Sequence, residues 1–516
     1  MKMKKINILL ALVASVLFGL TSCEDNLDIQ QHSVSSYDTY YQTDDEAEEG
    51  IVHCYVKMRT LYTGFNNDIQ FVKEHLSDNI WSGGGNHYDG NYYQLADYTF
   101  SSDYAAISTI YTNLYNLIYA TNVVIEKVKG GTEIQNRAIA EAKVFRAFAN
   151  FQLVTLWGTA PLVKHTLSES EYMQPNSTPD SLWAAVETDL KEAINSGALT
   201  QKASVNQPTA RVTKQFAQAM LGKAQLFQKK YAEAARTLDE VINSKLYILN
   251  PDLSNQGTPD GDNSVESLFE VNLPFDTNNS NENNNFRWIG AGLRAEKYSY
   301  TDGSPLCRAT WGYQQPRKDL YDAFVKVEGK DGYRLNNTIL TLDQLKEKLG
   351  ATPIVEITDN EGYFNYKYRI LAKYFANYFY ANNVRVMKYN EVLLLAAEAH
   401  LQAGDAATAI NYINEIRTRA KAPQLVAIDM ETIKTESRLE LYGEGQRYEN
   451  LVRWGDAVKV LGHNGESNPA LQTDGTVKWT SYNKAGECGF KERNYLWPFP
   501  ATEIQVNKNL KQNEGW

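Results

Sequence analysis

Apolar residues recur at helical spacing along most of this chain, and polar residues mark where the helices begin. Thr43 can cap a helix that opens with Asp44, Asp45 and Glu46, acidic residues that are favourable at the positive end of a helix dipole. The apolar period of 3.6 residues continues this helix to about Leu61. By the same criteria we predict further helices over residues 105–128, 132–157, 179–195, 213–229, 231–244, 388–403, 405–420 and 430–443.

Two of these helix pairs resemble each other. A shift of about 175 residues places Ala224, Leu226, Ala234, Leu238 and Val241 on Ala399, Leu401, Ala409, Ile413 and Ile416. Small residues where two helices touch, with larger ones where the next pair stacks, are typical of tetratricopeptide-like repeats. The pattern therefore predicts a mostly α-helical superhelix of stacked pairs; two unrelated amphipathic hairpins are the alternative.

Three long stretches, residues 77–102, 251–314 and 461–499, interrupt the helices. Loops of this length are uncommon in a compact domain unless they are disordered or functional. Disorder is the poorer explanation, because these stretches are rich in aromatic residues: Trp81, Tyr88, Tyr92, Tyr93, Phe286, Trp288, Trp311, Trp479 and Trp497. Aromatic rings in loops require either a packing partner or a ligand.

The first residues read as an export signal. Lys2, Lys4 and Lys5 precede an apolar stretch, residues 6–20, that is too short to span a bilayer. It ends in Leu20-Thr21-Ser22-Cys23, a small-residue triplet before cysteine as in the lipobox of bacterial lipoproteins. We expect cleavage after residue 22 and acylation of Cys23, whose acyl chains would hold the protein at a membrane. An ordinary signal peptide with an incidental cysteine is the alternative.

Charge and cysteine content narrow the function classes. Removal of residues 1–22 takes away three lysines and no acid, so the formal net charge of −11 becomes −14. A chain this acidic, with no basic tract, argues against a nucleic-acid partner. Cys54, Cys307 and Cys488 remain; any two of them could pair, and they form no metal-binding motif. The 33 tyrosines and 9 tryptophans suit a surface that grips an amphipathic ligand.

Several segments together resemble the SusD/RagB family of outer-membrane nutrient-binding lipoproteins of Bacteroidetes. They occur in the family's order and cover essentially the whole mature chain: the lipobox, the opening helix, and residues 140–163, 388–399, 403–420, 436–455, 495–504 and 509–513.

The resemblance implies a SusD-like α-α superhelix with a loop-rich ligand-binding half. It divides the chain into a signal peptide (1–22), a lipidated tether (23–42), an N-terminal part with tetratricopeptide-like helices (43–250) and a C-terminal part with the loop-rich region and further such helices (251–516). It also implies a SusC-like TonB-dependent transporter as partner and a place in the outer membrane, facing the cell exterior. Glu24 and Asp25 match the acidic residues that mark surface export in this family.

Family binding sites fall in loops that correspond to residues 80–93 and 278–313. Aromatic faces stack on the C–H face of a sugar, while amides and guanidinium groups bind its hydroxyls. We therefore predict Trp81, Tyr88 and Trp288 as stacking rings and Asn86 and Arg294 as hydrogen-bond donors. Tyr92 and Trp311 complete the predicted ligand-binding set. For any single ring, a plain packing role remains the alternative.

Other motifs favour structural interpretations. Gly83-Gly84-Gly85 lacks the Lys-Ser/Thr of a phosphate loop, and residues 260–263 lack the ligand spacing of a calcium loop. Glu436, Glu440 and Glu444 share one helix face and could be imagined as an acid/base pair, but arginines lie near them in sequence. We expect these carboxylates to form ion pairs with Arg438, Arg447 and Arg453. No catalytic residue, metal or cofactor is predicted.

The sequence thus predicts a cell-surface lipoprotein that binds an oligosaccharide or polysaccharide and delivers it to the transporter without cleaving it. Peptide capture is the alternative within the same family. A surface glycoside hydrolase is the alternative from the enzyme class. The identity of the glycan depends on how the rings are oriented, and stays open at this point.

Overall fold

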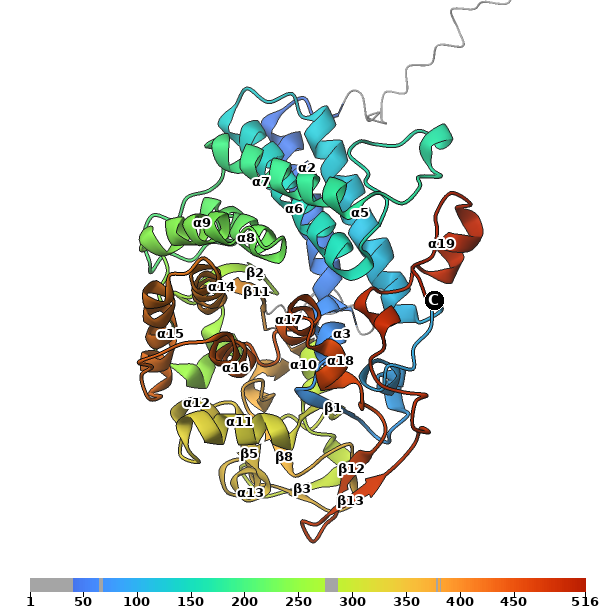
Figure 1. Cartoon of the computed structure of the whole chain (residues 1–516). Helices are drawn as coiled ribbons and strands as arrows, with labels where there is room; N and C mark the ends of the chain where they lie inside the picture. The colour runs from blue at the N-terminus through green and yellow to red at the C-terminus, as the bar shows by residue number, and fades with distance from the viewer. Residues whose placement is uncertain (1–39, 65–67, 274–285, 377–378, 381) are drawn as a thin grey trace, which may run out of the picture.

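The structure is a computed structural model that describes residues 40–64, 68–273, 286–376, 379–380 and 382–516. The predicted signal peptide, the acylated Cys23 and nearly all of the tether lie outside the described residues. Figure 1 shows a helical half that contains α2 and α5 to α9, and a second half in which short strands and helices alternate with loops.

All nine predicted helices are present, and their ends differ from the prediction by at most three residues. They are α2 (Asp44–Thr63), α5 (Ala105–Lys127), α6 (Glu133–Trp157), α7 (Pro179–Asn195), α8 (Lys214–Phe227), α9 (Tyr231–Asn243), α14 (Tyr389–Gln402), α15 (Ala406–Ala420) and α16 (Met430–Glu440). The predicted cap is confirmed: the Thr43 side chain accepts from the Glu46 N–H, and the Glu46 carboxylate accepts from the Thr43 N–H. This reciprocal pair fixes the start of α2.

The two similar hairpins lie next to each other, with α9 packed against α14 (Figure 1). Of the ten matched residues, all are buried except Leu401, which is partly buried. Close helix contact within the first hairpin depends on Gly222 of α8, because a Cβ there would lie 2.5 Å from Cγ of Leu238 in α9. The small residues therefore let two helices approach, as the repeat pattern predicts.

The remaining elements are short. The helices are α3 (Ile69–His75), α4 (Tyr93–Ala96), α10 (Phe286–Ala291), α11 (Lys318–Glu328), α12 (Tyr333–Asn336), α13 (Leu342–Leu349), α17 (Gln446–Trp454), α18 (Ala457–Leu461) and α19 (Ala501–Val506). The strands are β1 (Ile80–Gly83), β2 (Ser267–Val271), β3 (Tyr298–Tyr300), β4 (Tyr313–Pro316), β5 (Ile339–Thr341), β6 (Ala351–Pro353), β7 (Ile357–Thr358), β8 (Tyr363–Asn365), β9 (Phe375–Ala376), β10 (Phe379–Tyr380), β11 (Val384–Lys388), β12 (Asn468–Leu471) and β13 (Val477–Thr480).

The strands form separate small antiparallel sheets: β1 with β4, β2 with β11, β3 with β6, β5 with β8, β9 with β10, and β7, β12 and β13 together. The long interruptions predicted from the sequence contain several of these strands. One large hydrophobic cluster runs through the helices, and smaller clusters lie under the loop-rich half. The fold is therefore mostly α, with a rigid helical scaffold that carries a less regular half.

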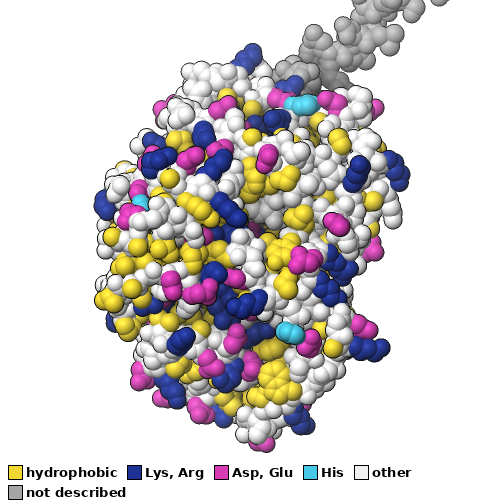
Figure 2. Space-filling model, in the orientation of Figure 1, with side chains coloured by type: hydrophobic (Ala, Val, Ile, Leu, Met, Phe, Trp, Pro, Cys, Tyr) yellow, Lys and Arg dark blue, Asp and Glu magenta, His cyan; other side chains and the backbone are white. Residues whose placement is uncertain are grey.

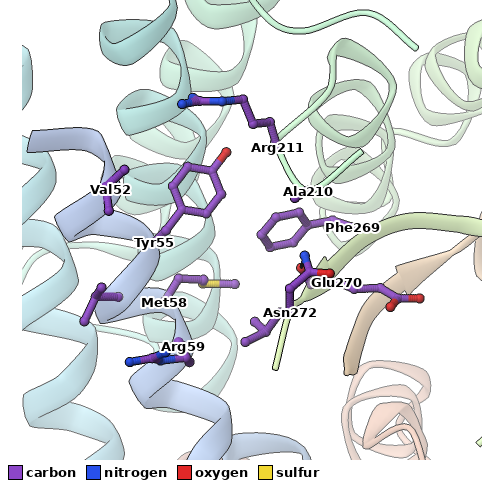
Figure 3. A pocket seen from close by; sticks show the side chains of 11 residues that line it. Val52, Tyr55, Met58, Arg59, Ala210, Arg211, Phe269, Glu270 and Asn272 are labelled. Atoms are coloured by element: carbon purple, nitrogen blue, oxygen red, sulfur yellow. Dashed lines mark hydrogen bonds between the residues drawn. The ribbon is translucent and has the colours of Figure 1, made fainter. Parts of the chain in front are cut away.

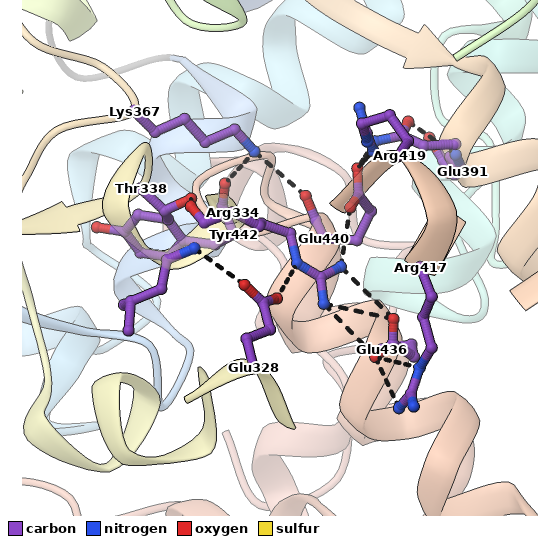
Figure 4. A network of polar contacts seen from close by, with 12 residues as sticks. Glu328, Arg334, Thr338, Lys367, Glu391, Arg417, Arg419, Glu436, Glu440 and Tyr442 are labelled. Carbon is purple, nitrogen blue, oxygen red and sulfur yellow. Dashed lines mark hydrogen bonds and ion pairs between the residues drawn. The ribbon is translucent and has the colours of Figure 1, made fainter. Parts of the chain in front are cut away.

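The acidic face of α16 is buried in an ion-pair network (Figure 4). The Arg334 guanidinium lies 2.6 Å from a Glu328 oxygen, 3.0 Å from Glu440 and 3.4 Å from Glu436. Arg417 pairs with Glu436 and Arg419 with Glu440, while Lys367 and Lys388 pair with Glu444. These carboxylates are ion-pair partners, as predicted. Glu444, however, lies beyond Glu440, the last residue of α16, so the three do not share one helix face.

The predicted partners of these acids are wrong. Arg438 and Arg447 bind Asp78, and Arg453 binds Glu398. Arg438 is two residues from Glu436 and therefore projects from a different side of the same helix. Proximity in the sequence was a poor guide here, because the true partners come from other elements, α12 and α15 among them.

Cys54, Cys307 and Cys488 are buried free thiols. Among the helices of the described residues, none combines the length and the apolar character needed to cross a bilayer.

Candidate functional site

The loop of residues 80–93 begins on a strand held by close backbone contact. In the β1–β4 pair, Trp81 lies opposite Gln315 and Gly83 opposite Tyr313. Gly83 has a φ of +74°, and a Cβ on it would lie 2.2 Å from the carbonyl oxygen of Gly312. Only glycine fits this conformation at this distance, so the backbone after Trp81 turns sharply at a fixed place.

Asp89 and Arg294 fix the tip of this loop. The Asp89 carboxylate accepts from the Gly85 N–H at 2.7 Å and from Nη1 of Arg294 at 2.6 Å. The Asn86 side chain accepts from the Tyr88 N–H at 2.9 Å. Asn86 and Tyr88 are nevertheless exposed, Tyr88 by 55%. The loop thus presents a ring and an amide to solvent from an ordered backbone.

Two further exposed rings reach this loop from the other end of the chain. The β12–β13 hairpin and the residues after it carry Trp479, which is 54% exposed, and Tyr482, which is 37% exposed. The Trp479 ring centroid lies 6.0 Å from that of Trp81, and the Tyr482 centroid lies 5.7 Å from that of Tyr88. We refer to Tyr88, Trp479 and Tyr482 as the aromatic platform.

The rings of the platform are not coplanar. The planes of Tyr88 and Tyr482 meet at 75°, and those of Trp81 and Trp479 at 72°. The imidazole of His87 lies against Tyr482, with centroids 3.8 Å apart and planes within 5°. Burial raises the pKa of the Tyr482 phenol above its ordinary value, and the protonated hydroxyl can donate a hydrogen bond. The platform therefore combines apolar faces with polar edges.

Trp81 supports this surface from beneath. It is 7% exposed, and its Nε1–H donates to the Glu361 carboxylate at 2.9 Å. The guanidinium of Arg317 lies over the ring, 4.0 Å from its centroid. One face of the indole is thus occupied within the protein, and an edge contact joins it to Trp479.

The structure brings together Trp81, Asn86, Tyr88 and Arg294 of the predicted set. Of the other three rings, it buries Tyr92 and Trp288 and partly buries Trp311. Tyr92 is fully buried against Phe71 and Tyr313. Trp288 is 2% exposed and packs on Tyr368. Trp311 is partly buried against the hydrophobic clusters. Their binding roles remain predictions, and residues 278–285 of the second predicted loop lie outside the described residues.

Sequence reasoning did not select Trp479 and Tyr482. Trp479 stands between polar residues in a four-residue strand, a pattern that places a large ring on an exposed edge. That pattern could have singled it out among the loop aromatics. Figure 2 shows hydrophobic side chains gathered at the surface low on this face, in the region of β1 and β12, with acidic and basic side chains interspersed around them.

A separate groove of about 290 Å³ lies in the helical half (Figure 3). Its walls come from α2, from Ala210 and Arg211, and from β2, with Tyr55 and Phe269 on opposite sides. None of the predicted site residues lines it. We place the candidate site at the aromatic platform because exposed rings, amides and a fixed loop coincide there.

Comparison with known proteins gives matches over nearly the whole chain. Residues 265–516 match the sequence model of the SusD family, and residues 27–226 match a second model described as "starch-binding associating with outer membrane". A SusD-like protein of Formosa agariphila is 24% identical over 97% of both chains. The starch-binding protein SusD of Bacteroides thetaiotaomicron is 24% identical over 82% of this chain and 81% of its own.

Among solved structures, a laminarin-binding SusD-like protein is 27% identical, with a TM-score of 0.76 over 92% of this chain and all of the other. Its fold is the one described above, a helical scaffold that carries a loop-rich half. Two sequence models of one family together match most of the chain, and its relatives are of similar length. This chain therefore belongs to the SusD/RagB family.

Proposed function

We propose that the protein binds a glycan chain at the aromatic platform. The observation that carries the proposal is that exposed rings from segments almost 400 residues apart meet at one loop: Tyr482 contacts Tyr88, and Trp479 contacts Trp81 of the same loop. Neighbouring exposed rings are typical of interaction surfaces, and their faces match the C–H face of a sugar ring.

The polar groups around the platform suit the edge of a sugar. Asn86 is exposed beside Tyr88. The Arg294 side chain, which is 27% exposed, forms an ion pair with Asp89 of the same loop. Amide and guanidinium groups donate hydrogen bonds to hydroxyls without requiring a charged ligand. Acidic and basic side chains are both interspersed here, so no single sign of charge prevails and a neutral carbohydrate fits this mixture.

The acids near the platform support binding without cleavage. A glycoside hydrolase needs two carboxyl groups that reach the scissile bond from opposite sides. Asp97 and Asp359 are 1% and 0% exposed and lie beneath the rings, in contact with His87. Asp89 and Glu361 are held by Arg294 and by Trp81. None of these four carboxylates is placed to act on a chain that lies on the platform.

Family membership extends the proposal to the cell surface. The lipidated Cys23 would hold the protein at the outer membrane, and the bound glycan would pass to a SusC-like TonB-dependent transporter. The descriptions of the relatives named above support glycan binding and association with the outer membrane, whereas the anchor and the transporter rest on the family resemblance.

The test is a binding panel with the purified protein. Laminarin is the first ligand, because a 27% identical relative binds it, followed by starch, other polysaccharides and peptides. Retarded migration in a polysaccharide gel without release of reducing ends supports the proposal. Release of reducing ends would show a hydrolase, and binding to peptides alone would show the RagB-like alternative.

A further inference from the structure

The residue beneath the platform is a buried histidine between two buried acids. His87 is 2% exposed. Its Nδ1 lies 3.2 Å from an oxygen of Asp359, and its Nε2 lies 3.3 Å from an oxygen of Asp97. The first contact is a hydrogen bond, whereas the second is close enough for an ion pair but is not aligned as a hydrogen bond. Both acids are buried as deeply as the imidazole.

This arrangement requires the protonated imidazole. A neutral imidazole has an N–H on only one nitrogen, so one carboxylate would face a lone pair and both negative charges would stay uncompensated in the interior. Burial by itself lowers the pKa of His87, but the two carboxylates outweigh burial and raise that pKa to about 9. At neutral pH His87 is therefore an imidazolium ion.

The imidazolium contacts residues that lie far apart in the sequence. Asp97 follows α4, and its carboxylate also accepts from Nδ2 of Asn483 at 2.8 Å. Asp359 follows β7, which pairs with the hairpin strand β12. The imidazole itself stacks on Tyr482. The imidazole thus adds a buried link between the loop that carries Tyr88 and the segment that carries Tyr482, beside the direct contact of those two rings.

Other titratable groups surround this triad. They are the phenols of Tyr88, Tyr93 and Tyr482 against the imidazole, the thiol of Cys488 beside Asp97, Lys297 on the side of Asp359, and Glu356 beyond Tyr482. Only Asp97 and Asp359 form ion pairs with His87 among the described residues.

We propose that His87 is the positioning residue of the aromatic platform: by holding Asp97 and Asp359 together in its cationic form, it sets the orientation of Tyr88 and Tyr482 that the ligand requires. The ligand in this inference rests on the proposed function, whereas the effect of His87 on the orientation of the rings does not. His87 does not touch the ligand, since Tyr482 covers it. Binding depends on its proton because the neutral ring no longer holds both acids.

The experiment measures laminarin affinity of the wild-type protein and of Asp359→Asn between about pH 6 and pH 10. In the wild type we expect affinity to be constant to about pH 8 and to fall about tenfold as pH rises through the pKa of His87. Asp359→Asn keeps the pair with Asp97 but removes one of the two charges that raise the pKa. Whatever its affinity at pH 6, the midpoint of its fall should move down by about one pH unit.

His87→Gln distinguishes this titration from ionisation of the platform phenols. The variant should bind weakly at every pH and show no fall near pH 9, whereas phenol ionisation would persist in it. If this variant fails to fold, Asp359→Asn alone decides the matter. A wild-type affinity that is flat to pH 10, or an unchanged midpoint in Asp359→Asn, would overturn the proposal.

Near-UV circular dichroism gives a readout that needs no ligand. Stacked rings contribute to this spectrum, so it should change at the same pH as affinity and shift with it in Asp359→Asn. If no glycan binds, the proposed function fails, and this titration still decides whether His87 orients the rings. If platform variants abolish glycan binding, but wild-type affinity and the near-UV spectrum both stay constant with pH, only the His87 inference fails.

Discussion

The guanidinium of Arg317 lies over the indole of Trp81, 4.0 Å from the ring centroid, so the tryptophan first predicted to stack on a ligand already stacks on a cation of its own protein. Its Nε1–H is also engaged, with Glu361. The exposed neighbour of Trp81 is Trp479, which meets it edge to face. We therefore assign the ligand contact to Trp479 and the support to Trp81, a division that mutagenesis can test.

Trp479→Ala should weaken glycan binding by about 1–2 kcal/mol, or roughly five- to thirtyfold in Kd, and leave the melting temperature unchanged, because the ring is half exposed. Trp81→Ala should instead lower the free energy of unfolding by about 3–5 kcal/mol, as expected for a buried tryptophan. Calorimetric titration and thermal unfolding measure the two effects. A large loss of stability in Trp479→Ala would contradict the division.

Tyr88→Ala and Tyr482→Ala should each reduce affinity by about 1 kcal/mol or more through the loss of a stacking face. Tyr172, which is 60% exposed in the helical half, provides the matched control, since Tyr172→Ala removes an equally exposed ring away from the platform. Equal affinity of all three variants, measured by calorimetry at one pH, would remove the platform as the binding site.

Arg294 has two roles that can be separated. Arg294→Met should weaken binding more than Asp89→Asn, because Asp89 only fixes the loop whereas the guanidinium also donates to ligand hydroxyls. We expect a difference of about 1 kcal/mol in binding free energy. Glu296→Gln is the control, since it leaves the Arg294–Asp89 pair in place. Identical losses in the two variants would mean that Arg294 acts through the loop alone.

Arg334 should be essential for the loop-rich half to stay folded. Arg334→Met leaves Glu328, Glu436 and Glu440 buried with less positive charge and should cost about 3–5 kcal/mol of unfolding free energy. Lys318→Met, which breaks an exposed pair with Asp322, should cost at most about 0.5 kcal/mol. Chemical denaturation of both variants measures the difference, and similar values would contradict the assignment.

The same network predicts acid sensitivity. Burial alone would raise the pKa of Glu440, but Arg419, Arg334 and Lys388 outweigh it and hold that pKa well below its usual range. A lowered pKa stabilises the folded protein above the unfolded value of about 4.3, and this contribution is lost as pH falls. Unfolding free energy should therefore decrease below about pH 4.5. In Arg334→Met the folded-state pKa of Glu440 moves back toward the unfolded value, so chemical denaturation should show a smaller decrease over the same pH range.

The helical half could be predicted closely because its signals are local. Capping residues such as Thr43 and the small residues of the repeat act within a few turns of helix, so the helix ends fall within three residues of the prediction. The network on α16 shows the limit of such reasoning: the acids were recognised, but their true partners lie on other elements.

The site was only partly accessible to sequence reasoning, because exposure of a ring depends on the whole fold. Tyr88 and Tyr92 are four residues apart, yet the first is 55% exposed and the second fully buried. Tyr482 joins the site through contacts with residues almost 400 positions earlier. No local pattern encodes that pairing, nor the place of His87 between two distant acids.

The hairpin that carries Trp479 touches the rest of the protein through few elements, chiefly β7 along one strand and the contacts of Asn483. Its outer strand is largely in solvent. Such a hairpin can change length or sequence over generations while the helices keep their packing. Under the proposed function, ligand preference can therefore change through this one small appendage while the helical framework is kept.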